Sequence, residues 1–449
     1  MSVQQEGFLA SLDGRAAEIV DSCTRCGKCV EVCPMPGITG IDASEPGRIV
    51  SGVLDILRDG KGPEASARWA SVCSGSGHCI TACDYGVNPR FMLSLARRAL
   101  KKGQPEETRR EAGKKSFKDM SRGVKVLSRL QLPPALLERL NPSSHPERPE
   151  PPDLIFYTGC NMLKTPHIGL LCLDVLDRLG ISYEVYGGPA NCCGVLQWRP
   201  GDDANSGRQG YKTIERFAQT KTSEVLSWCP TCQIQFGEIS LPSHGGEKGP
   251  AFDMTMFAVF LDRHLDALKT MMTRPVKKRV ALHEHPGALG VVDAVKRVLS
   301  AIPGLEVVDL HPPQVGYQMT SLRSVPDFRR NLVATVLKSA EEAGVTTLAD
   351  IYHADHREFA GHSGQWPFEI VNFMELIGES MGLYREDVFK RLKTMRDVDA
   401  IVADTTDLID AHGLDPEEVR EVVLKDIIGE QHLPADRSKH AEVLAGKAQ

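Results

Sequence analysis

Four features are missing from the 449-residue sequence, and each absence excludes a class of protein. No apolar run approaches the roughly 20 residues of a membrane-spanning helix, so we expect no direct membrane span. The opening MSVQQEGFLASLDGR lacks the apolar segment of a secretory signal, which favours a cytoplasmic protein whose membrane association, if any, is made through a partner. The net charge of −6 argues against nucleic acid as a partner. No GxGxxG-type glycine cluster occurs, so we expect neither flavin nor NAD on this chain.

Cysteine is also missing from nearly half of the chain, because none of the 13 cysteines follows Cys232. They fall in two dense groups, one between Cys23 and Cys83 and one between Cys160 and Cys232. In a cytoplasmic protein, clustered cysteines indicate metal or redox chemistry rather than a disulfide framework. Cys172 lies alone on the apolar face of a predicted helix, and we expect it to be an ordinary core residue.

The first group opens with the run CTRCGKCVEVCP, whose four cysteines are separated by two, two and three residues and followed by proline. This is the bacterial ferredoxin pattern, in which three thiolates hold one iron–sulfur cluster and the fourth serves a second cluster. A zinc ribbon needs two separated CxxC pairs, so the spacing favours iron and sulfide. The four residues are Cys23, Cys26, Cys29 and Cys33.

The partner run, CSGSGHCITACD, has Ser76 where a complete ferredoxin run has a cysteine. Its C-x₅-C-x₃-C spacing resembles the iron–sulfur subunit of succinate dehydrogenase and fumarate reductase, in which the gap leaves a three-iron cluster. The resemblance implies a [4Fe-4S] cluster on Cys23, Cys26, Cys29 and Cys83, and a [3Fe-4S] cluster on Cys33, Cys73 and Cys79.

A second [4Fe-4S] cluster remains the alternative, completed by a Ser76 alkoxide, Asp84 or His78. Serine is a hard ligand that binds iron poorly beside thiolate, which favours the three-iron interpretation. We expect His78 to donate a hydrogen bond near the cluster rather than to bind iron.

A different pattern begins at Asp153, where short apolar strands alternate with helical segments. The carboxyl ends of successive strands in an open α/β sheet face one crevice, so cysteines that follow these strands are expected to converge there. Adjacent cysteines reach two different irons, which a simple zinc site does not require. The five converging residues are Cys160, Cys192, Cys193, Cys229 and Cys232.

The pattern C-x₃₁-CCG-x₃₄-CxxC resembles the CCG domain of the heterodisulfide reductase family, and the two N-terminal runs resemble that family's small ferredoxin-type subunit. Their order resembles the family's long catalytic subunit. The resemblance implies a noncubane iron–sulfur cluster on the five cysteines, with Cys193 and Cys192 closest to substrate as the catalytic residues. It also implies a flavoprotein or other iron–sulfur subunits as partners, and a thiol or disulfide as substrate.

The family carries two CCG domains, and this chain holds the second copy only in degenerate form. A shift of 123 residues aligns WCPTCQIQF (228–236) with IYHADHREF (351–359), and FDMTMFAVFL (252–261) pairs with FEIVNFMELI (368–377). Where the first copy has the cysteines of its CCG and CxxC motifs, the second has Val315, Gly316, Tyr352 and Asp355. The sequence therefore predicts a second α/β domain without thiolate ligands.

Histidines occupy the strand ends of this degenerate copy. His283 and His285 alternate on one predicted strand, while His353 and His356 form an HxxH at another strand end. If the two strand ends meet, these four side chains form a candidate metal site or supply general acids. The alternative is that they replace lost ligands with structural hydrogen bonds alone.

The sequence as a whole predicts a multidomain protein, with an α-helical ferredoxin-type domain followed by two α/β, Rossmann-like CCG-type domains. The expected boundaries are 1–130 for the ferredoxin-type domain, 131–152 for a Pro-rich linker, 153–272 for the CCG domain, 273–384 for the degenerate copy and 385–449 for a helical extension. The basic stretch 97–129, with 12 Lys or Arg against four acidic residues, is expected to be a solvated face or a docking patch.

Two functions fit these features. The first is an iron–sulfur oxidoreductase subunit of a heterodisulfide reductase-like complex, which passes electrons between a flavoprotein and a thiol or disulfide at the CCG cluster. The second is a pure electron-transfer subunit that serves a separate dehydrogenase. The missing second set of thiolates keeps both open, because cleaving a disulfide between twin clusters requires two clusters.

Overall fold

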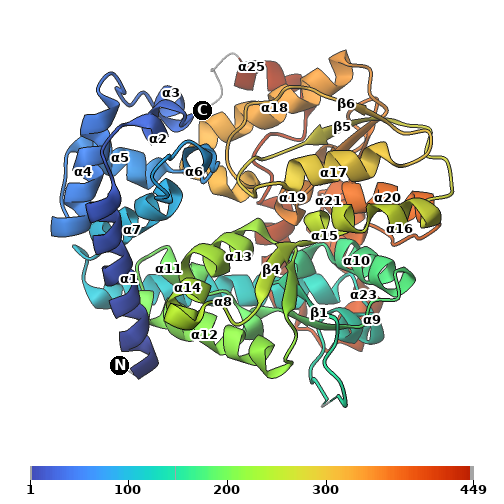
Figure 1. Ribbon diagram of the computed structural model, residues 1–449. Helices are drawn as coiled ribbons and strands as arrows, with labels where there is room; N and C mark the ends of the chain where they lie inside the picture. The colour runs from blue at the N-terminus through green and yellow to red at the C-terminus, as the bar shows by residue number, and fades with distance from the viewer. Residues whose placement is uncertain (1–2, 147, 445–449) are drawn as a thin grey trace.

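The computed structural model describes residues 3–146 and 148–444 of the chain. A helical N-terminal module is followed by two parallel sheets, each flanked by helices, and by a helical C-terminal segment (Figure 1). The expectation of a multidomain protein with helical and α/β parts is confirmed. Among the described helices, none is long and apolar enough to cross a membrane.

The N-terminal module holds both ferredoxin-type cysteine runs, and each run enters a one-turn helix through a glycine. Gly27 and Gly77 have φ of 87° and 83°, a left-handed conformation that only glycine adopts without strain. The helices of this module are α1 (Val3–Ser22), α2 (Lys28–Glu31), α3 (Met35–Thr39), α4 (Pro46–Asp59), α5 (Glu64–Val72), α6 (His78–Thr81), α7 (Pro89–Lys101), α8 (Glu106–Arg129) and α9 (Pro134–Leu140).

Helix α8 contains most of the basic stretch that the sequence marked as a solvated face or docking patch. Arg122 and Lys125 form ion pairs with Glu418 of α24 (Pro416–Val422), and Asp119 pairs with Lys425 just beyond that helix. Part of the basic face is therefore covered by acidic side chains of the same chain.

The two sheets share one strand order. The first runs β2-β1-β3-β4 and the second β6-β5-β7-β8, with every neighbouring pair parallel. The segments matched in the predicted repeat lie at equivalent strands of the two sheets. The first pair follows the third strand of each half, and the second pair contains the fourth. The strands are β1 (Leu154–Gly159), β2 (Tyr183–Gly187), β3 (Glu224–Ser227), β4 (Asp253–Met256), β5 (Arg279–His283), β6 (Glu306–Val308), β7 (Thr347–Asp350) and β8 (Glu369–Asn372).

The helices of the two α/β halves pack against each other symmetrically. Helix α10 contacts α20, and α15 contacts α17, so the helix after the first strand of one half meets the helix after the last strand of the other. Trp228 stacks on Phe373 across this boundary, with ring centroids 5.6 Å apart. The first half contains η1 (Asn161–Lys164), α10 (Pro166–Arg178), η2 (Pro189–Asn191), α11 (Val195–Trp198), α12 (Asp203–Gln219), α13 (Pro230–Ile234), η3 (Gln235–Ser240), α14 (Leu241–Gly245), η4 (Gly246–Lys248), α15 (Phe257–Arg263) and α16 (Leu265–Met271). The second contains α17 (Val291–Ser300), η5 (Met319–Leu322), α18 (Pro326–Glu342), α19 (His353–Phe359), η6 (Ala360–His362) and α20 (Phe373–Met381).

The C-terminal segment returns to the N-terminal module. Val126 and Leu127 of α8 share a hydrophobic core with Ile401 and Val419, and Lys164 forms a buried ion pair of 2.7 Å with Asp426. The segment expected to be a helical extension is helical, and α24 continues into a wider helical turn. The elements are α21 (Val388–Met395), α22 (Val398–Asp404), α23 (Thr406–Ala411), α24, η7 (Val423–Ile428), η8 (Arg437–Lys439) and α25 (His440–Leu444).

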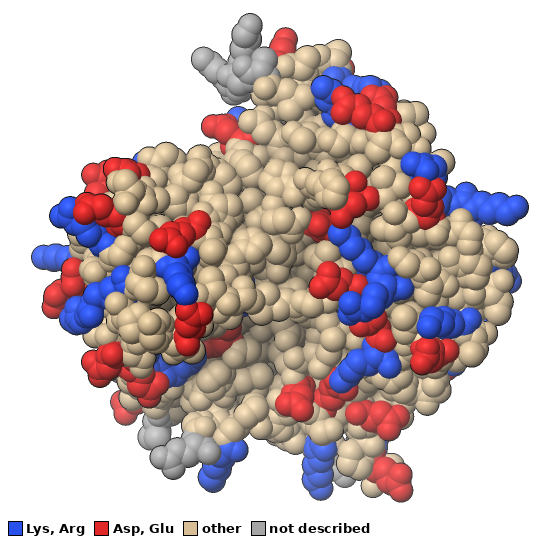
Figure 2. Space-filling view, turned by 45° about the horizontal axis from the view of Figure 1, so that its top comes forward, with Lys and Arg blue, Asp and Glu red and all other residues tan. Residues whose placement is uncertain are grey.

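Charged side chains of both signs are interspersed around the rim of the face shown in Figure 2, and its middle carries few of them. No large field of one sign covers this face, so long-range steering of a highly charged macromolecule is not favoured there.

Candidate functional site

Four thiols of the N-terminal module surround one cavity. Cys23, Cys26 and Cys29 reach it from the loop between α1 and α2, and Cys83 reaches it from the end of α6. Burial, with the neighbouring Cys23 and Cys26, raises the pKa of Cys29 to about 12. Without a cation this thiol stays protonated, and a metal that displaces the proton removes that cost. The donor set of soft sulfur atoms fits iron.

Three further thiols, Cys33, Cys73 and Cys79, line a second cavity. Cys33 comes from the first run and the other two from the second, so the runs exchange ligands as the ferredoxin pattern requires. Trp69 donates a hydrogen bond from Nε1 to the sulfur of Cys33 at 3.4 Å. Burial raises the pKa of Cys79 above its ordinary value, as does the neighbouring Cys73.

The three candidates for a fourth ligand have different surroundings. Ser76 lines the second cavity, and its Oγ accepts a hydrogen bond of 2.8 Å from the backbone N–H of Gly316. His78 also borders the cavity, but its Nε2 lies 3.0 Å from the carbonyl oxygen of Gln314. Asp84 forms an ion pair with Lys28 near the surface. Ser76 and His78 therefore both lie beside the three thiols, whereas Asp84 is paired with a charged partner.

The third group of thiols is gathered where the strands of the first sheet end. Side-chain hydrogen bonds link Cys160 to Cys192, Cys192 to Cys193, Cys193 to Cys232 and Cys232 to Cys229. All five side chains are buried.

Two glycines allow the backbone to approach these sulfurs. A Cβ at Gly159 would stand 3.2 Å from the sulfur of Cys232, and a Cβ at Gly194 would stand 2.5 Å from the carbonyl oxygen of Ser206. Both glycines also have positive φ, of 66° and 86°. The glycine of the CCG motif is therefore required by space as well as by backbone conformation.

The thiols of this buried group do not share one protonation state. A hydrogen bond with Cys160, together with burial, raises the pKa of Cys192 well above its ordinary value. A hydrogen bond with Cys192, together with burial, does the same for the pKa of Cys193. The pKa of Cys229 is lowered by hydrogen bonds from Cys232 and, next, from His353. Five sulfur donors in a buried place without neutralising charge fit a metal cluster better than an apolar core.

The predicted histidines divide among three places. His283 and His285 face each other with their Nε2 atoms 3.2 Å apart, and Asp355 lies 3.6 Å from Nε2 of His285. Nδ1 of His285 lies 2.6 Å from the carbonyl oxygen of Val315, so this nitrogen carries the proton and the Nε2 lone pair points to the other two groups. Burial lowers the pKa of His283 to about 3, which keeps that ring neutral.

The other two histidines lie elsewhere. His353 contacts Cys229 of the five-thiol group. His356 is enclosed by two carboxylates, with Nδ1 2.9 Å from Asp350 and Nε2 2.7 Å from Asp387. The structure thus brings together His283, His285 and Asp355, and it separates His353 and His356 from them.

The positions that the repeat aligns with the CCG and CxxC cysteines hold other side chains. Asp355, aligned with Cys232, lies 3.6 Å from Nε2 of His285, and Tyr352, aligned with Cys229, is fully buried. The nearby Gly287 packs against the N-terminal module, because a Cβ there would stand 2.4 Å from the carbonyl oxygen of Gly75. The loop of the second ferredoxin-type cavity therefore packs directly onto the second α/β half.

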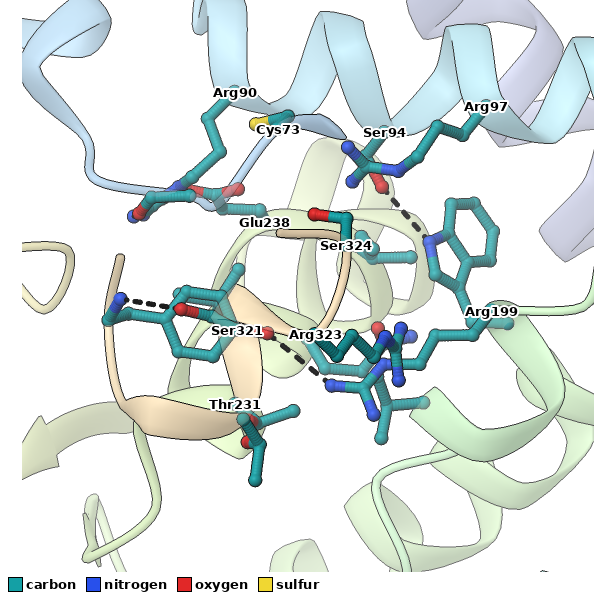
Figure 3. Close-up of a pocket in the computed structure, with 18 of the residues that line it drawn as sticks. Cys73, Arg90, Ser94, Arg97, Arg199, Thr231, Glu238, Ser321, Arg323 and Ser324 are labelled. Atoms are coloured by element: carbon teal, nitrogen blue, oxygen red, sulfur yellow. Dashed lines mark hydrogen bonds and ion pairs between the residues drawn. The ribbon is translucent and has the colours of Figure 1, made fainter. Parts of the chain in front are cut away.

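Sequence patterns gave no indication of an arginine-lined pocket at the junction of the N-terminal module and the two α/β halves (Figure 3). Arg97, Arg199 and Arg323 line it, and they are more than 100 residues apart in sequence. No local motif joins them, so only the packing of the three parts brings them together.

Comparisons with known proteins agree with this division of the chain. Residues 22–88 match the family model of the 4Fe-4S dicluster domain, and residues 154–237 match the model of the Cysteine-rich domain called CCG. One subunit of the dihydromethanophenazine:CoB–CoM heterodisulfide reductase from Methanosarcina mazei is 26% identical over 419 residues, which cover 81% of this chain and 94% of that protein. The chain is a homologue of this heterodisulfide reductase subunit.

The chain is also similar to the corresponding heterodisulfide reductase subunit from Methanosarcina barkeri. The identity is 23%, over 81% of this chain and 94% of that protein. One subunit of the fumarate reductase (CoM/CoB) of Methanothermobacter marburgensis is 25% identical over 311 residues, covering 66% of this chain and 47% of that protein. These relatives are named as subunits of reductases, which supports an iron–sulfur oxidoreductase or electron-transfer role for this chain.

Proposed function

We propose that the chain is the iron–sulfur subunit of a heterodisulfide reductase-like complex, passing electrons between a flavoprotein partner and a thiol or disulfide substrate at the CCG thiols. The observation that carries this proposal is the succession of three thiol groups from the protein surface to the buried strand ends of the first sheet. Cys29 of the first group lies near Cys79 of the second, and Cys73 of the second group borders the same pocket as Thr231 of the CCG loop.

Electrons enter or leave at the first group in this proposal. Cys26 is exposed, and the apolar side chains of Val32 and Tyr85 next to the same group are 43% and 55% exposed. Exposed apolar side chains beside a redox centre suit a transient docking surface for a redox partner. The second group is reached through Cys33, which is the last cysteine of the first run.

The clusters proposed for these groups are those of the ferredoxin and CCG patterns. Cys23, Cys26, Cys29 and Cys83 would hold a [4Fe-4S] cluster, and Cys33, Cys73 and Cys79 a [3Fe-4S] cluster. Cys160, Cys192, Cys193, Cys229 and Cys232 would hold a noncubane cluster that supplies electrons to the substrate. Cys193 and Cys192 lie nearest to substrate in this proposal, as the resemblance to the CCG pattern implies.

The substrate chemistry requires protons as well as electrons. Reduction of a disulfide to two thiols breaks the S–S bond, takes up two electrons and adds one proton to each sulfur. His353 contacts Cys229, and its Nδ1 has no hydrogen-bond partner among the described residues, so this ring is placed to move a proton at the thiol group. The electrons come from the redox partner.

The proposed function is tested by adding thiols and disulfides to the anaerobically purified protein. We expect them to change the paramagnetic signal of the CCG cluster and to leave the signals of the two ferredoxin-type clusters in place. Spectra that no thiol or disulfide alters, together with rapid reduction of all clusters by a flavoprotein, contradict the proposal and leave the pure electron-transfer subunit. The observation that favours this alternative is that the position aligned with Cys232 holds Asp355, which lies beside His285 and not beside a thiol.

The nuclearity of the second cluster is tested by Ser76→Cys. A three-iron cluster is paramagnetic when oxidised, whereas an oxidised four-iron cluster of this type is not. We expect the substitution to supply a fourth thiolate and to remove the oxidised-state signal. Ser74→Cys, at a neighbouring hydroxyl 3.1 Å away, is the matched control and is expected to preserve it. Absence of that signal from the wild-type protein contradicts the three-iron proposal.

We also propose a metal ion at His283, His285 and Asp355. Two imidazole nitrogens and one carboxylate within reach of one point form the ligand set of many zinc and non-haem iron sites. Metal analysis is expected to find one ion beyond the iron of the clusters, lost in His283→Gln and retained in His311→Gln, at an exposed histidine. An equal metal content in both variants and the wild type contradicts the assignment.

A further inference from the structure

The pocket shown in Figure 3 has a volume of about 160 Å³ and is bounded by all three parts of the chain. Helix α7 forms one wall, α11 and α13 form a second, and the segment 317–324 forms the third. Cys73 of the second thiol group borders it, as does Thr231, which lies between Cys229 and Cys232. The pocket therefore adjoins both the second ferredoxin-type group and the loop of the CCG group.

The side chains that line the pocket carry a large excess of positive charge. Its five arginines face one acidic residue, Glu238. Two of the five are neutralised, because Arg90 pairs with Glu238, and Arg98 pairs with Asp13 and Asp203 outside the pocket. The other three, Arg97, Arg199 and Arg323, form no ion pair within residues 3–146 and 148–444.

The unpaired arginines repel one another. Figure 3 draws the guanidinium groups of Arg199 and Arg323 next to each other in the pocket. Repulsion by Arg199, followed by burial and by Arg97, lowers the pKa of Arg323 to about 10. Arg199 donates a hydrogen bond to the hydroxyl of Tyr317 at 3.4 Å, and Arg97 donates one to the carbonyl of Ala70. Neither contact supplies the negative charge that would offset this repulsion.

We propose that this pocket binds the charged groups of an anionic substrate, a thiol or disulfide that carries two carboxylates or comparable anionic groups. Guanidinium groups match the geometry of such anions with paired hydrogen bonds. The hydroxyls of Ser94, Ser321 and Ser324 line the same walls and add neutral donors. That the ligand is a thiol or disulfide rests on the proposed function. That the pocket binds anions follows from its three arginines without ion pairs among the described residues.

The test uses three small probes and the full chain, purified anaerobically. Mercaptosuccinate has a thiol and two carboxylates, succinate has the carboxylates alone, and 2-mercaptoethanol has the thiol alone. Calorimetry at low salt is expected to show binding of both dicarboxylates and much weaker binding of 2-mercaptoethanol, with affinity that falls as salt is added. Mercaptosuccinate, but not succinate, is expected to change the signal of the CCG cluster.

Arg199→Gln and Arg323→Gln are each expected to weaken dicarboxylate binding about tenfold or more, because each removes a charge-assisted pair of hydrogen bonds. Arg208→Gln, at an exposed arginine of α12, is the matched control and should leave binding unchanged. Thermal unfolding without ligand checks the fold. Relief of the repulsion predicts that Arg323→Gln unfolds at the wild-type temperature or above it.

Two results would overturn the proposal in distinguishable ways. If both substitutions leave succinate binding unchanged, the pocket assignment is wrong and the proposed function is unaffected. If mercaptosuccinate binding depends on the arginines but the CCG signal does not respond, the proposed thiol chemistry fails, and the pocket's role in binding substrate fails with it.

Discussion

Replacing Cys193 with alanine is expected to eliminate the cluster of the CCG group and to leave both ferredoxin-type clusters intact. Cys193 is linked through its thiol to Cys192 and Cys232, so its loss opens the middle of the five-thiol group. We expect iron content to fall by the irons of that one cluster, and any thiol-dependent activity to fall by at least about 100-fold, as when a reacting group is displaced. Iron analysis and spectroscopy on the anaerobically purified variant measure both effects.

Cys172→Ala is the matched control for this substitution. Cys172 is also fully buried and belongs to the same α/β half, but it lies in the hydrophobic core among apolar side chains of α10. Its removal is expected to leave iron content and every cluster signal unchanged. Loss of the same irons in the two variants would show that unfolding, and not ligand loss, releases the cluster.

Arg90→Met is expected to lower the free energy of unfolding by about 3–5 kcal/mol, the range measured when one partner of a buried ion pair is removed. The guanidinium of Arg90 joins the three parts of the chain. It donates to the carbonyls of Gly75 and Gly287, and its Nε lies 2.9 Å from the carboxylate of Glu238. Without it the half-buried loops lose their donor and Glu238 is left without a partner. The midpoint of urea unfolding measures the change.

Two further variants show whether this effect comes from the junction. Arg58→Met removes an exposed arginine that pairs with Asp55 one helical turn away, and it should change stability by no more than about 0.5 kcal/mol. Arg90→Met combined with Glu238→Gln should cost less than the sum of the single changes, because the second substitution removes the unpaired charge. Equal unfolding midpoints for Arg90→Met and Arg58→Met would contradict the role of Arg90.

The most accurate sequence predictions are those that depend on local spacing. The alternation of strands and helices after Asp153 gives two sheets with one shared order. The pairs of segments matched in the repeat, 123 residues apart for the first pair and 116 for the second, lie at strands of the same rank, because apolar strands keep their pattern even where cysteines are missing. These features depend on residues that are close in sequence, so the spacing of apolar residues along the chain predicts them.

The histidines show where local spacing was insufficient. Their placement at strand ends suggested one site of four, but the structure puts His353 against Cys229 and encloses His356 between two carboxylates. His353 and His356 are three residues apart on the short helix α19, so their side chains point in somewhat different directions. Each therefore contacts a different set of neighbours. Asp355, between them in sequence, is the side chain that reaches His285.

The sequence by itself determined the thiol inventory of this protein, because seven and five cysteines at fixed spacings can be assigned to clusters before any fold is known. Only the tertiary structure decided what surrounds those thiols. The packing of Gly287 against Gly75 joins the second ferredoxin-type loop to the second α/β half, and the meeting of Arg97, Arg199 and Arg323 makes a positively charged pocket. Such contacts join segments more than 100 residues apart, and their geometry follows from how three cores pack together, which no local pattern encodes.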